Sequence, residues 1–169
     1  LSERIRIVAL AGGHNSALLS EQMRIFRPHL YSSLAPARTS DYGARSATLT
    51  EIASDEEVDT VLVATSGSAG IEPTVAALRH GKVVALANKE VLVMAGHLVR
   101  RAMLAGGGEL RPVDSEHSAI WQCLWGEEQH EIRRILLTAS GGAFRDFDEG
   151  QLAAVTPEQA LNHPTWKMG

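Results

Sequence analysis

Short apolar runs alternate with helical segments over the first two thirds of the chain, and this alternation constrains the fold more than any other feature. The runs are residues 5–10 (IRIVAL), 58–64 (VDTVLVA), 82–87 (KVVALA) and 110–113 (LRPV). The intervening periodicity predicts helices over residues 17–26, 71–80 and 88–104. Nearly continuous apolar strands that alternate with helices are typical of a parallel sheet covered on both faces. The sequence therefore predicts a doubly wound α/β domain.

The pattern changes after Val113. A helix is predicted over residues 117–124 and a strand over residues 132–138 (IRRILLT), followed by a polar stretch and a short helix that begins at Pro157. This region is too short to close a hydrophobic core by itself. We therefore predict a boundary after residue 111, with residues 112–169 forming the start of a second, α+β domain.

Composition excludes several classes of function. The net charge is −4 and aromatic residues make up 5% of the chain, so a basic or base-stacking surface for nucleic acid is not expected. Cys123 is the only cysteine, which excludes an intrachain disulfide and a thiolate metal cluster. No apolar run approaches the roughly 18 residues that a membrane span needs. The first residue is Leu1, without an initiator Met or a signal-peptide pattern, and we expect the chain to be part of a longer protein.

Two carboxylates lie two residues apart in residues 112–118 (PVDSEHS). In extended backbone, Asp114 and Glu116 would point to the same face. Mg²⁺ and Mn²⁺ prefer carboxylate oxygens and keep open positions for water and substrate. The pair therefore indicates a site for a divalent metal ion. The alternative is two solvated acids near the end of a strand.

The turn after the first predicted strand is a candidate for cofactor binding. In many dinucleotide-binding folds an acid near such a position binds the ribose 2′-hydroxyl, and none is present in residues 11–15 (AGGHN). Gly13, His14 and Asn15 would not repel a 2′-phosphate, which favours NADP over NAD. The alternative is a plain turn between a strand and a helix capped by Ser16.

Two further segments follow predicted strands. Thr65, Ser66 and Gly67 begin a loop of small residues, 65–70 (TSGSAG), that would let a cofactor approach the backbone at a helix N-terminus; a tight connection is the alternative. The second segment is Asn88-Lys89-Glu90, at the strand edge where open α/β sheets bind ligands. Its lysine could meet an oxyanion or a phosphate. The alternative is helix capping by the asparagine beside a solvated lysine.

Near the C-terminal end, Ser140 stands before two glycines and suits a phosphate cradle, although an ordinary turn is the alternative. The segment 163–169 (HPTWKMG) places His163, Trp166 and Met168 in irregular structure. An aromatic side chain on a loop suits a lid that excludes water from a closed site. The alternative is a tryptophan that anchors a core.

Taken together, these segments resemble the 1-deoxy-D-xylulose 5-phosphate reductoisomerases, which use NADPH in the non-mevalonate isoprenoid pathway. The matching runs occur in the family's order: ALANKEVLV (85–93), PVDSEHSAIWQCL (112–124), ILLTASGGAFRD (135–146) and HPTWKMG (163–169). The resemblance covers nearly the whole chain. It implies a Rossmann-like, NADPH-binding domain over residues 1–111 and the beginning of the catalytic domain over residues 112–169.

The resemblance also implies roles for single residues. The metal, Mg²⁺ or Mn²⁺, would be held by Asp114 and Glu116. Catalytic residues would be Lys89, Asp114, Glu116 and His163. Substrate contacts would come from Ser115, Glu116, Ser140, His163, Trp166 and Met168. The NADPH site would be lined by Gly13, His14, Asn15, Thr65, Ser66, Gly67, Asn88 and Glu90.

The sequence departs from the family pattern at several places. The leading Gly-rich GSTGSIG loop is absent, as is everything past the flap, including the third metal carboxylate. A basic residue is common where His14 stands, Pro is common where Ala143 stands, and Ser is common where Lys167 stands. Because of these missing parts, we expect the 169 residues alone to be inactive.

The implied reaction is the rearrangement and reduction of 1-deoxy-D-xylulose 5-phosphate to 2-C-methyl-D-erythritol 4-phosphate. Two alternatives stay open: a related NADP-dependent dehydrogenase of another phosphorylated or amino-acid-derived substrate, and a non-catalytic module for cofactor binding or dimerisation. The family implies a homodimer that binds a sugar phosphate, without a nucleic-acid or membrane partner. It also implies a location in the bacterial cytoplasm or in a plastid.

Overall fold

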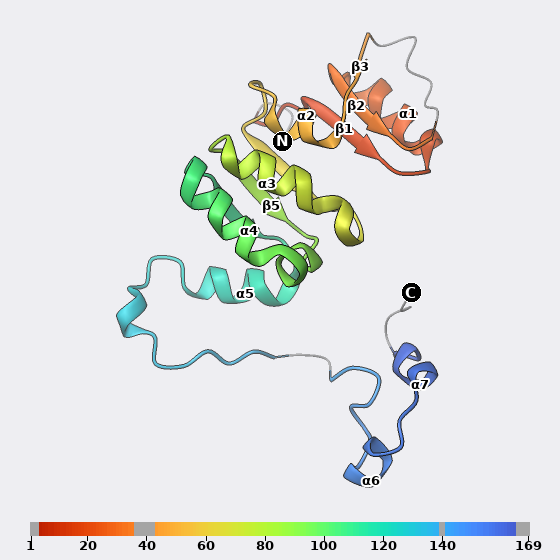
Figure 1. Ribbon diagram of the computed structural model, residues 1–169, viewed down its shortest axis with the longest axis vertical. Coiled ribbons are helices and arrows are strands. Elements are labelled where there is room, and N and C mark those ends of the chain that lie inside the picture. Colours follow the sequence, from red (N-terminus) through yellow and green to blue (C-terminus); the bar gives the residue numbers. More distant parts are fainter. Residues whose placement is uncertain (1–3, 36–42, 139–140, 165–169) are drawn as a thin grey trace. The chain divides into compact units, whose positions relative to one another are not determined.

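The computed structural model describes residues 4–35, 43–138 and 141–164 (Figure 1). It divides into two compact units, Leu1–Asp114 and Ser115–Gly169. Both parallel sheets belong to the first unit. In the second unit the described elements are helices.

The first sheet of the first unit has the strand order β1-β2-β3. Its strands are β1 (Ala9–Gly12), β2 (Leu30–Ser33) and β3 (Arg45–Ser46), and all pair in parallel. Helix α1 (Ser16–Phe26) connects β1 to β2 and buries Leu19 and Met23, which lie one helical turn apart. These elements are red and orange in Figure 1.

The second sheet has the strand order β4-β5-β6, again parallel. Its strands are β4 (Thr60–Val63), β5 (Val83–Leu86) and β6 (Glu109–Pro112). The helical elements of this half are α2 (Leu49–Ser54), the 3₁₀ turn η1 (Gly67–Gly70), α3 (Ile71–Arg79) and α4 (Glu90–Gly106). Figure 1 shows α3 and α4 side by side over β5, which places them as one helical layer on this sheet.

The core of the first unit lies between this sheet and its helices. Leu78 of α3, Val84 of β5 and Val91 of α4 have no exposed surface. The buried cluster is Ala53, Val63, Ala77, Leu78, Val84, Leu86, Val91, Val99 and Ala102. Burying one valine or leucine side chain contributes about 1.5–3 kcal/mol, so this cluster fixes α3 and α4 against the sheet.

Polar side-chain interactions connect the amino-terminal ends of the strands. Lys82, just before β5, is buried and donates from its ammonium group to the backbone carbonyls of Asp55 and Val58, in the turn that leads into β4. His29, just before β2, places Nε2 3.7 Å from the carboxylate of Asp55. The turn after α2 is therefore held from two strands at the edge opposite their carboxyl ends.

Glycines permit the close approach of α3 and α4 at their C-terminal ends. An added Cβ on Gly106 would lie 2.3 Å from the backbone oxygens of Leu78 and Arg79. The next residue, Gly107, ends α4 in the left-handed conformation (φ 72°), and its N–H bonds the carbonyl of Met103. A side chain at Gly106 would push the helix ends apart.

The predicted doubly wound α/β class is confirmed, although several elements differ from the sequence expectation. The first strand begins at Ala9 instead of residue 5, and Ile5 is exposed, because β2 pairs only with residues 9–12. Sequence analysis missed β2, β3 and α2. The signal for α2 was present: Thr48 and Glu51 form a capping box in which each side chain bonds the other's backbone N–H.

The second unit contains α5 (Ser115–Cys123), the 3₁₀ turn η2 (Gln129–Glu131), α6 (Glu149–Leu152) and α7 (Pro157–Leu161). The predicted short helix that begins at Pro157 is confirmed. Its N-cap is Thr156, which forms a capping box with Gln159, and the proline fills the first helical position, where no N–H is needed.

The predicted strand over residues 132–138 is wrong. This segment has no regular secondary structure, and Ile135, Leu136 and Leu137 are 57%, 72% and 64% exposed. A strand needs a neighbour for its backbone N–H and C=O groups, and the described residues of the second unit contain no other strand. An apolar run alone is therefore not enough to form a strand.

Within the described ranges, no helix is both long and apolar enough to cross a bilayer.

Candidate functional site

The carboxyl ends of β4 and β5 are joined by backbone hydrogen bonds. The N–H groups of Ala87 and Asn88, just after β5, both donate to the carbonyl of Val63, at 3.0 and 3.2 Å. The loop 65–70 leaves β4 at this point, and Asn88-Lys89-Glu90 leaves β5. The two predicted cofactor segments are thus brought together at the edge where open α/β sheets bind their ligands.

The loop 65–70 is shaped by two glycines and by the side chain of Asn88. Gly67 has φ 58°, a left-handed conformation that favours glycine. The Nδ2 atom of Asn88 donates to the carbonyl of Gly67 at 2.9 Å, and only 3% of Asn88 is exposed. An added Cβ on Gly70 would lie 2.9 Å from Asn88 Nδ2 and from Thr65 Oγ1. The sequence interpretation of the loop missed this role of Gly70.

Two polar atoms beneath this loop have no hydrogen-bond partner within the described part of the chain. They are Thr65 Oγ1 and Asn88 Oδ1, and both are shielded from solvent. Burying an unsatisfied polar atom costs free energy, so proteins rarely leave one without a reason. The hydroxyl can donate or accept, whereas the amide oxygen can only accept. Because both atoms are shielded from solvent, a ligand could reach them only if the loop moved.

The alternative in which Asn88 only caps the following helix is contradicted. Lys89 occupies the N-cap position of α4 and makes no side-chain cap, while the Asn88 amide bonds Gly67 instead. Lys89 and Glu90 are exposed at the start of α4. Glu90 lies in the first turn, where its negative charge complements the positive end of the helix dipole.

Gly13, His14 and Asn15 lie between β1 and α1 and are all exposed. Asn15, not Ser16 as predicted, is the N-cap of α1, and its side chain accepts a hydrogen bond from Leu18 N at 3.1 Å. Asn15 is the N-cap because Ser16 is already the first residue of the helix. The turn therefore presents the backbone of Gly13 and the imidazole of His14 at the carboxyl end of β1.

The backbone geometry assumed for the predicted metal site is wrong. Helix α5 begins at Ser115, so residues 114–116 are not extended. In a helix successive residues are rotated by about 100° around the axis, so side chains two residues apart point in roughly opposite directions. Both carboxylates would share one face only in a strand. Asp114 instead follows β6 at the end of the first unit, and Glu116 lies in the first turn of α5. Ser115 Oγ donates to Glu116 Oε2 at 3.1 Å.

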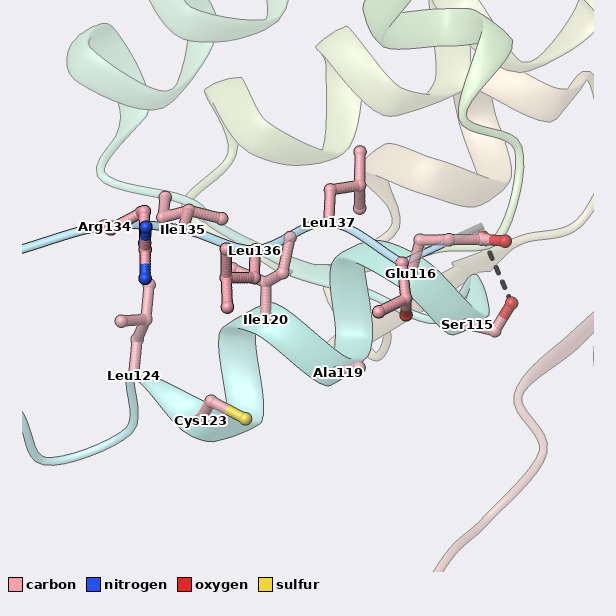
Figure 2. A pocket seen from close by; sticks show the side chains of 11 residues that line it. Ser115, Glu116, Ala119, Ile120, Cys123, Leu124, Arg134, Ile135, Leu136 and Leu137 are labelled. Carbon is pink, nitrogen blue, oxygen red and sulfur yellow. Dashed lines mark hydrogen bonds between the residues drawn. The ribbon is translucent and has the colours of Figure 1, made fainter. Parts of the chain in front are cut away.

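A pocket of about 660 Å³ lies beside Glu116 within the second unit. Figure 2 shows its walls: one side comes from α5, and the other from the segment around residues 134–138. Glu116 and Ser115 lie at one end and Arg134 at the other, with Ile120 and Leu136 among the apolar residues between them.

Two family models cover almost the whole chain. The model described as 1-deoxy-D-xylulose 5-phosphate reductoisomerase matches residues 1–96, and the model of the C-terminal domain of the same enzyme matches residues 110–169. The chain belongs to the 1-deoxy-D-xylulose 5-phosphate reductoisomerase family. The resemblance drawn from the four sequence runs is thereby confirmed.

Curated reductoisomerases from bacteria support this membership. The enzyme of Pelotomaculum thermopropionicum is 45% identical over 181 aligned positions, which cover 100% of this chain and 47% of the relative. That of Thermomicrobium roseum is 47% identical and covers 99% of this chain and 45% of the relative. The chain thus spans about half the length of these relatives.

Solved reductoisomerase structures share the fold. The Zymomonas mobilis enzyme in complex with NADPH has a TM-score of 0.82 at 38% identity, over 96% of this chain and 45% of that chain. A reductoisomerase in complex with NADPH, fosmidomycin and magnesium has a TM-score of 0.77 at 37% identity, over 99% of this chain and 46% of that chain. The Rossmann-like prediction for the first unit agrees with these neighbours.

The remaining predicted reductoisomerase residues divide into two groups. Ser140, Trp166 and Met168 lie outside the described residues. His163 is half-buried just after α7.

Within the described ranges, no group of three or more His, Cys, Asp or Glu side chains is placed to hold a metal ion. Two carboxylates with water and substrate still suit Mg²⁺, which often binds to only one or two protein carboxylates.

Proposed function

We propose that this protein, as its complete natural polypeptide, converts 1-deoxy-D-xylulose 5-phosphate to 2-C-methyl-D-erythritol 4-phosphate with NADPH and Mg²⁺ or Mn²⁺. The observation that carries the proposal is the match of reductoisomerase family models to residues 1–96 and 110–169. The complex of a related enzyme with NADPH, fosmidomycin and magnesium supports the choice of cofactors.

The first unit is proposed to bind NADPH at the carboxyl edge of its sheets. Residues 65–70 offer glycines and backbone amides before α3, and residues 66–69 of this loop are exposed. At the end of β1, Gly13 and His14 suit the adenosine end because no acid there would repel a 2′-phosphate. These observations fit the dinucleotide.

The metal is proposed to bind Asp114 and Glu116. Their hard oxygen donors suit Mg²⁺ or Mn²⁺, and the substrate's own oxygens would complete the coordination. Ser115 would bind a substrate hydroxyl, and Ser140 would bind the phosphate and so position the reacting carbons. Lys89, exposed at the start of α4, would contribute a positive charge to the substrate near the metal.

When bound, the metal would supply Lewis-acid stabilisation and NADPH would supply the hydride. The chain's own residues then bind, orient and shield the substrate. The flap residues His163, Trp166 and Met168 are proposed to close over it and exclude water. Residues 1–111 would form the cofactor domain, and residues 112–169 the beginning of the catalytic domain. A homodimer in the bacterial cytoplasm or in a plastid stays a prediction.

The decisive experiment is NADPH oxidation by the complete natural polypeptide, supplied with 1-deoxy-D-xylulose 5-phosphate and Mn²⁺. Consumption that requires both substrate and metal, and that a chelator stops, would establish the function. A folded, NADPH-binding protein that consumes no NADPH would contradict it and favour a dehydrogenase of another substrate. The same assay on the 169-residue chain is expected to show no turnover.

A further inference from the structure

We propose that Asn88 is a positioning residue of the cofactor site, which holds the loop 65–70 in its binding conformation through the Gly67 carbonyl before any cofactor arrives. The inference rests on the proposed function in taking NADPH as the ligand. The donor end of the side chain, Nδ2, fixes the loop.

The loop is ordered in part by its own 3₁₀ turn, η1, in which Gly70 is buried. Residues 66–69 are all exposed, so packing restrains them little. Gly67 and Gly70 bring the conformational freedom of residues without a side chain, and ordering them costs entropy. The bond from Asn88 Nδ2 to Gly67 O, 2.9 Å long, spans 21 residues and ties the loop to the end of β5. It restrains the loop at its left-handed residue, Gly67.

Asn88 is itself rigidly held, which a positioning residue requires. Its backbone N–H donates to Val63 O at 3.2 Å, so the residue is anchored to the end of β4, where the loop starts. Its side chain is 3% exposed and lies against the Cα of Gly70, where an added Cβ would come within 2.9 Å of Nδ2. The amide therefore meets both the middle and the end of the loop. A preformed loop lowers the entropy cost of binding.

The first test uses hydrogen exchange of the backbone amides in the cofactor-free protein. The variant Asn88→Leu keeps a branched side chain of similar volume but removes both polar ends. We expect amides 67–71 to exchange about tenfold faster, with the core amides of β5 unchanged. Asn88→Asp, which keeps an acceptor but loses the donor to Gly67, should behave in the same way. If either folded variant exchanges at the wild-type rate in this loop, the positioning role is wrong.

The second test measures NADPH affinity and kinetics in the complete polypeptide. We expect Asn88→Leu to weaken NADPH binding about three- to tenfold, as the loss of one hydrogen bond that orders the loop predicts, and to raise KM for NADPH while kcat at saturating NADPH stays within about twofold. The matched control is Thr74→Val, which removes a buried hydroxyl on α3 that has no partner among the described residues, and it should leave loop exchange and NADPH affinity unchanged.

The outcomes separate the two levels of the proposal. Weaker NADPH binding with unchanged loop exchange would mean that Asn88 acts only by direct contact, and would overturn the positioning role. Faster loop exchange with unchanged NADPH affinity would also overturn it, because the loop would then not matter for the cofactor. A wild-type protein that binds NADPH but does not turn over the sugar phosphate would remove the proposed function and leave these two measurements valid.

Discussion

The ammonium group of Lys82 donates to the backbone carbonyl of Val58, 24 residues earlier in the chain, although the lysine is only 8% exposed. The same group also donates to the carbonyl of Asp55. Lys82 lies just before β5, and its ammonium group supplies hydrogen bonds to two carbonyls in the turn between α2 and β4. This link holds together the strand ends opposite the edge proposed to bind the cofactor.

Replacing Lys82 should therefore destabilise the first unit. Lys82→Met keeps much of the aliphatic stem but leaves both carbonyls without their donor, and we expect a loss of about 1–3 kcal/mol in the free energy of unfolding. Urea unfolding followed by circular dichroism measures the change. Arg79→Met, at an exposed position on α3, is the control and should change stability by less than about 0.5 kcal/mol. Equal stability of the two variants would disprove the link's importance.

Two glycines of α4 should respond in opposite directions to the same substitution. Gly106→Ala would place a Cβ 2.3 Å from the backbone oxygens of Leu78 and Arg79, so we expect destabilisation by more than about 1 kcal/mol. Gly96→Ala meets nothing within 4 Å and should stabilise the helix by about 0.5–1 kcal/mol. Thermal unfolding of both variants tests the pair. A stabilising Gly106→Ala would contradict the close contact of α3 and α4.

The capping box of α2 should make the start of this helix sensitive to acid. The backbone N–H of Thr48 donates to the Glu51 carboxylate at 2.7 Å, and this bond is the main cause that lowers the pKa of Glu51 below its usual value. A lowered pKa in the folded state means that the stabilisation is present above the ordinary pKa of about 4.5 and is lost as the pH falls through the folded value.

Amide exchange at the first turn of α2 should accordingly rise on acidification below about pH 4.5, relative to the intrinsic rate. Glu51→Gln, which keeps an acceptor for the Thr48 N–H but does not titrate, should remove most of this pH dependence. A wild-type profile that matches that of the glutamine variant would show that the carboxylate does not contribute.

The predicted metal ligand Asp114 gives a test in the complete polypeptide. Asp114→Asn removes a negative oxygen donor, and we expect metal-dependent turnover to be abolished while NADPH affinity stays near the wild-type value. NADPH oxidation over a Mn²⁺ titration measures the effect. Near-normal rates would remove Asp114 from the set of ligands.

Some structural features were readable from the sequence because they depend on local pattern. The apolar runs at β4 and β5 and the small-residue loop after β4 predicted a doubly wound domain. Residues 132–138 show where this reasoning stops. Their composition favours a strand as strongly as that of β5, but a strand also needs a neighbouring backbone, and sequence periodicity does not supply one.

The site shows the same division. Asn88, Thr65 and Gly67 were predicted near the cofactor because they follow strands. The hydrogen bond from Asn88 to Gly67 and the contact with Gly70 were not predictable, since they depend on how two strand ends are placed side by side. The backbone conformation before α5 was predicted wrongly for a related reason: the spacing of two carboxylates is compatible with both an extended segment and a helix.

By itself, the sequence determined the family, the α/β class and the residue types available for a metal and a dinucleotide, because order and spacing along the chain carry that information. Only the tertiary structure decided that the Asn88 amide holds a loop instead of capping its own helix. It also decided that Lys82 is buried, and that α5 starts between Asp114 and Glu116. Each of these depends on contacts between segments distant in sequence or on the point where a helix begins, and such contacts exist only once the chain has packed.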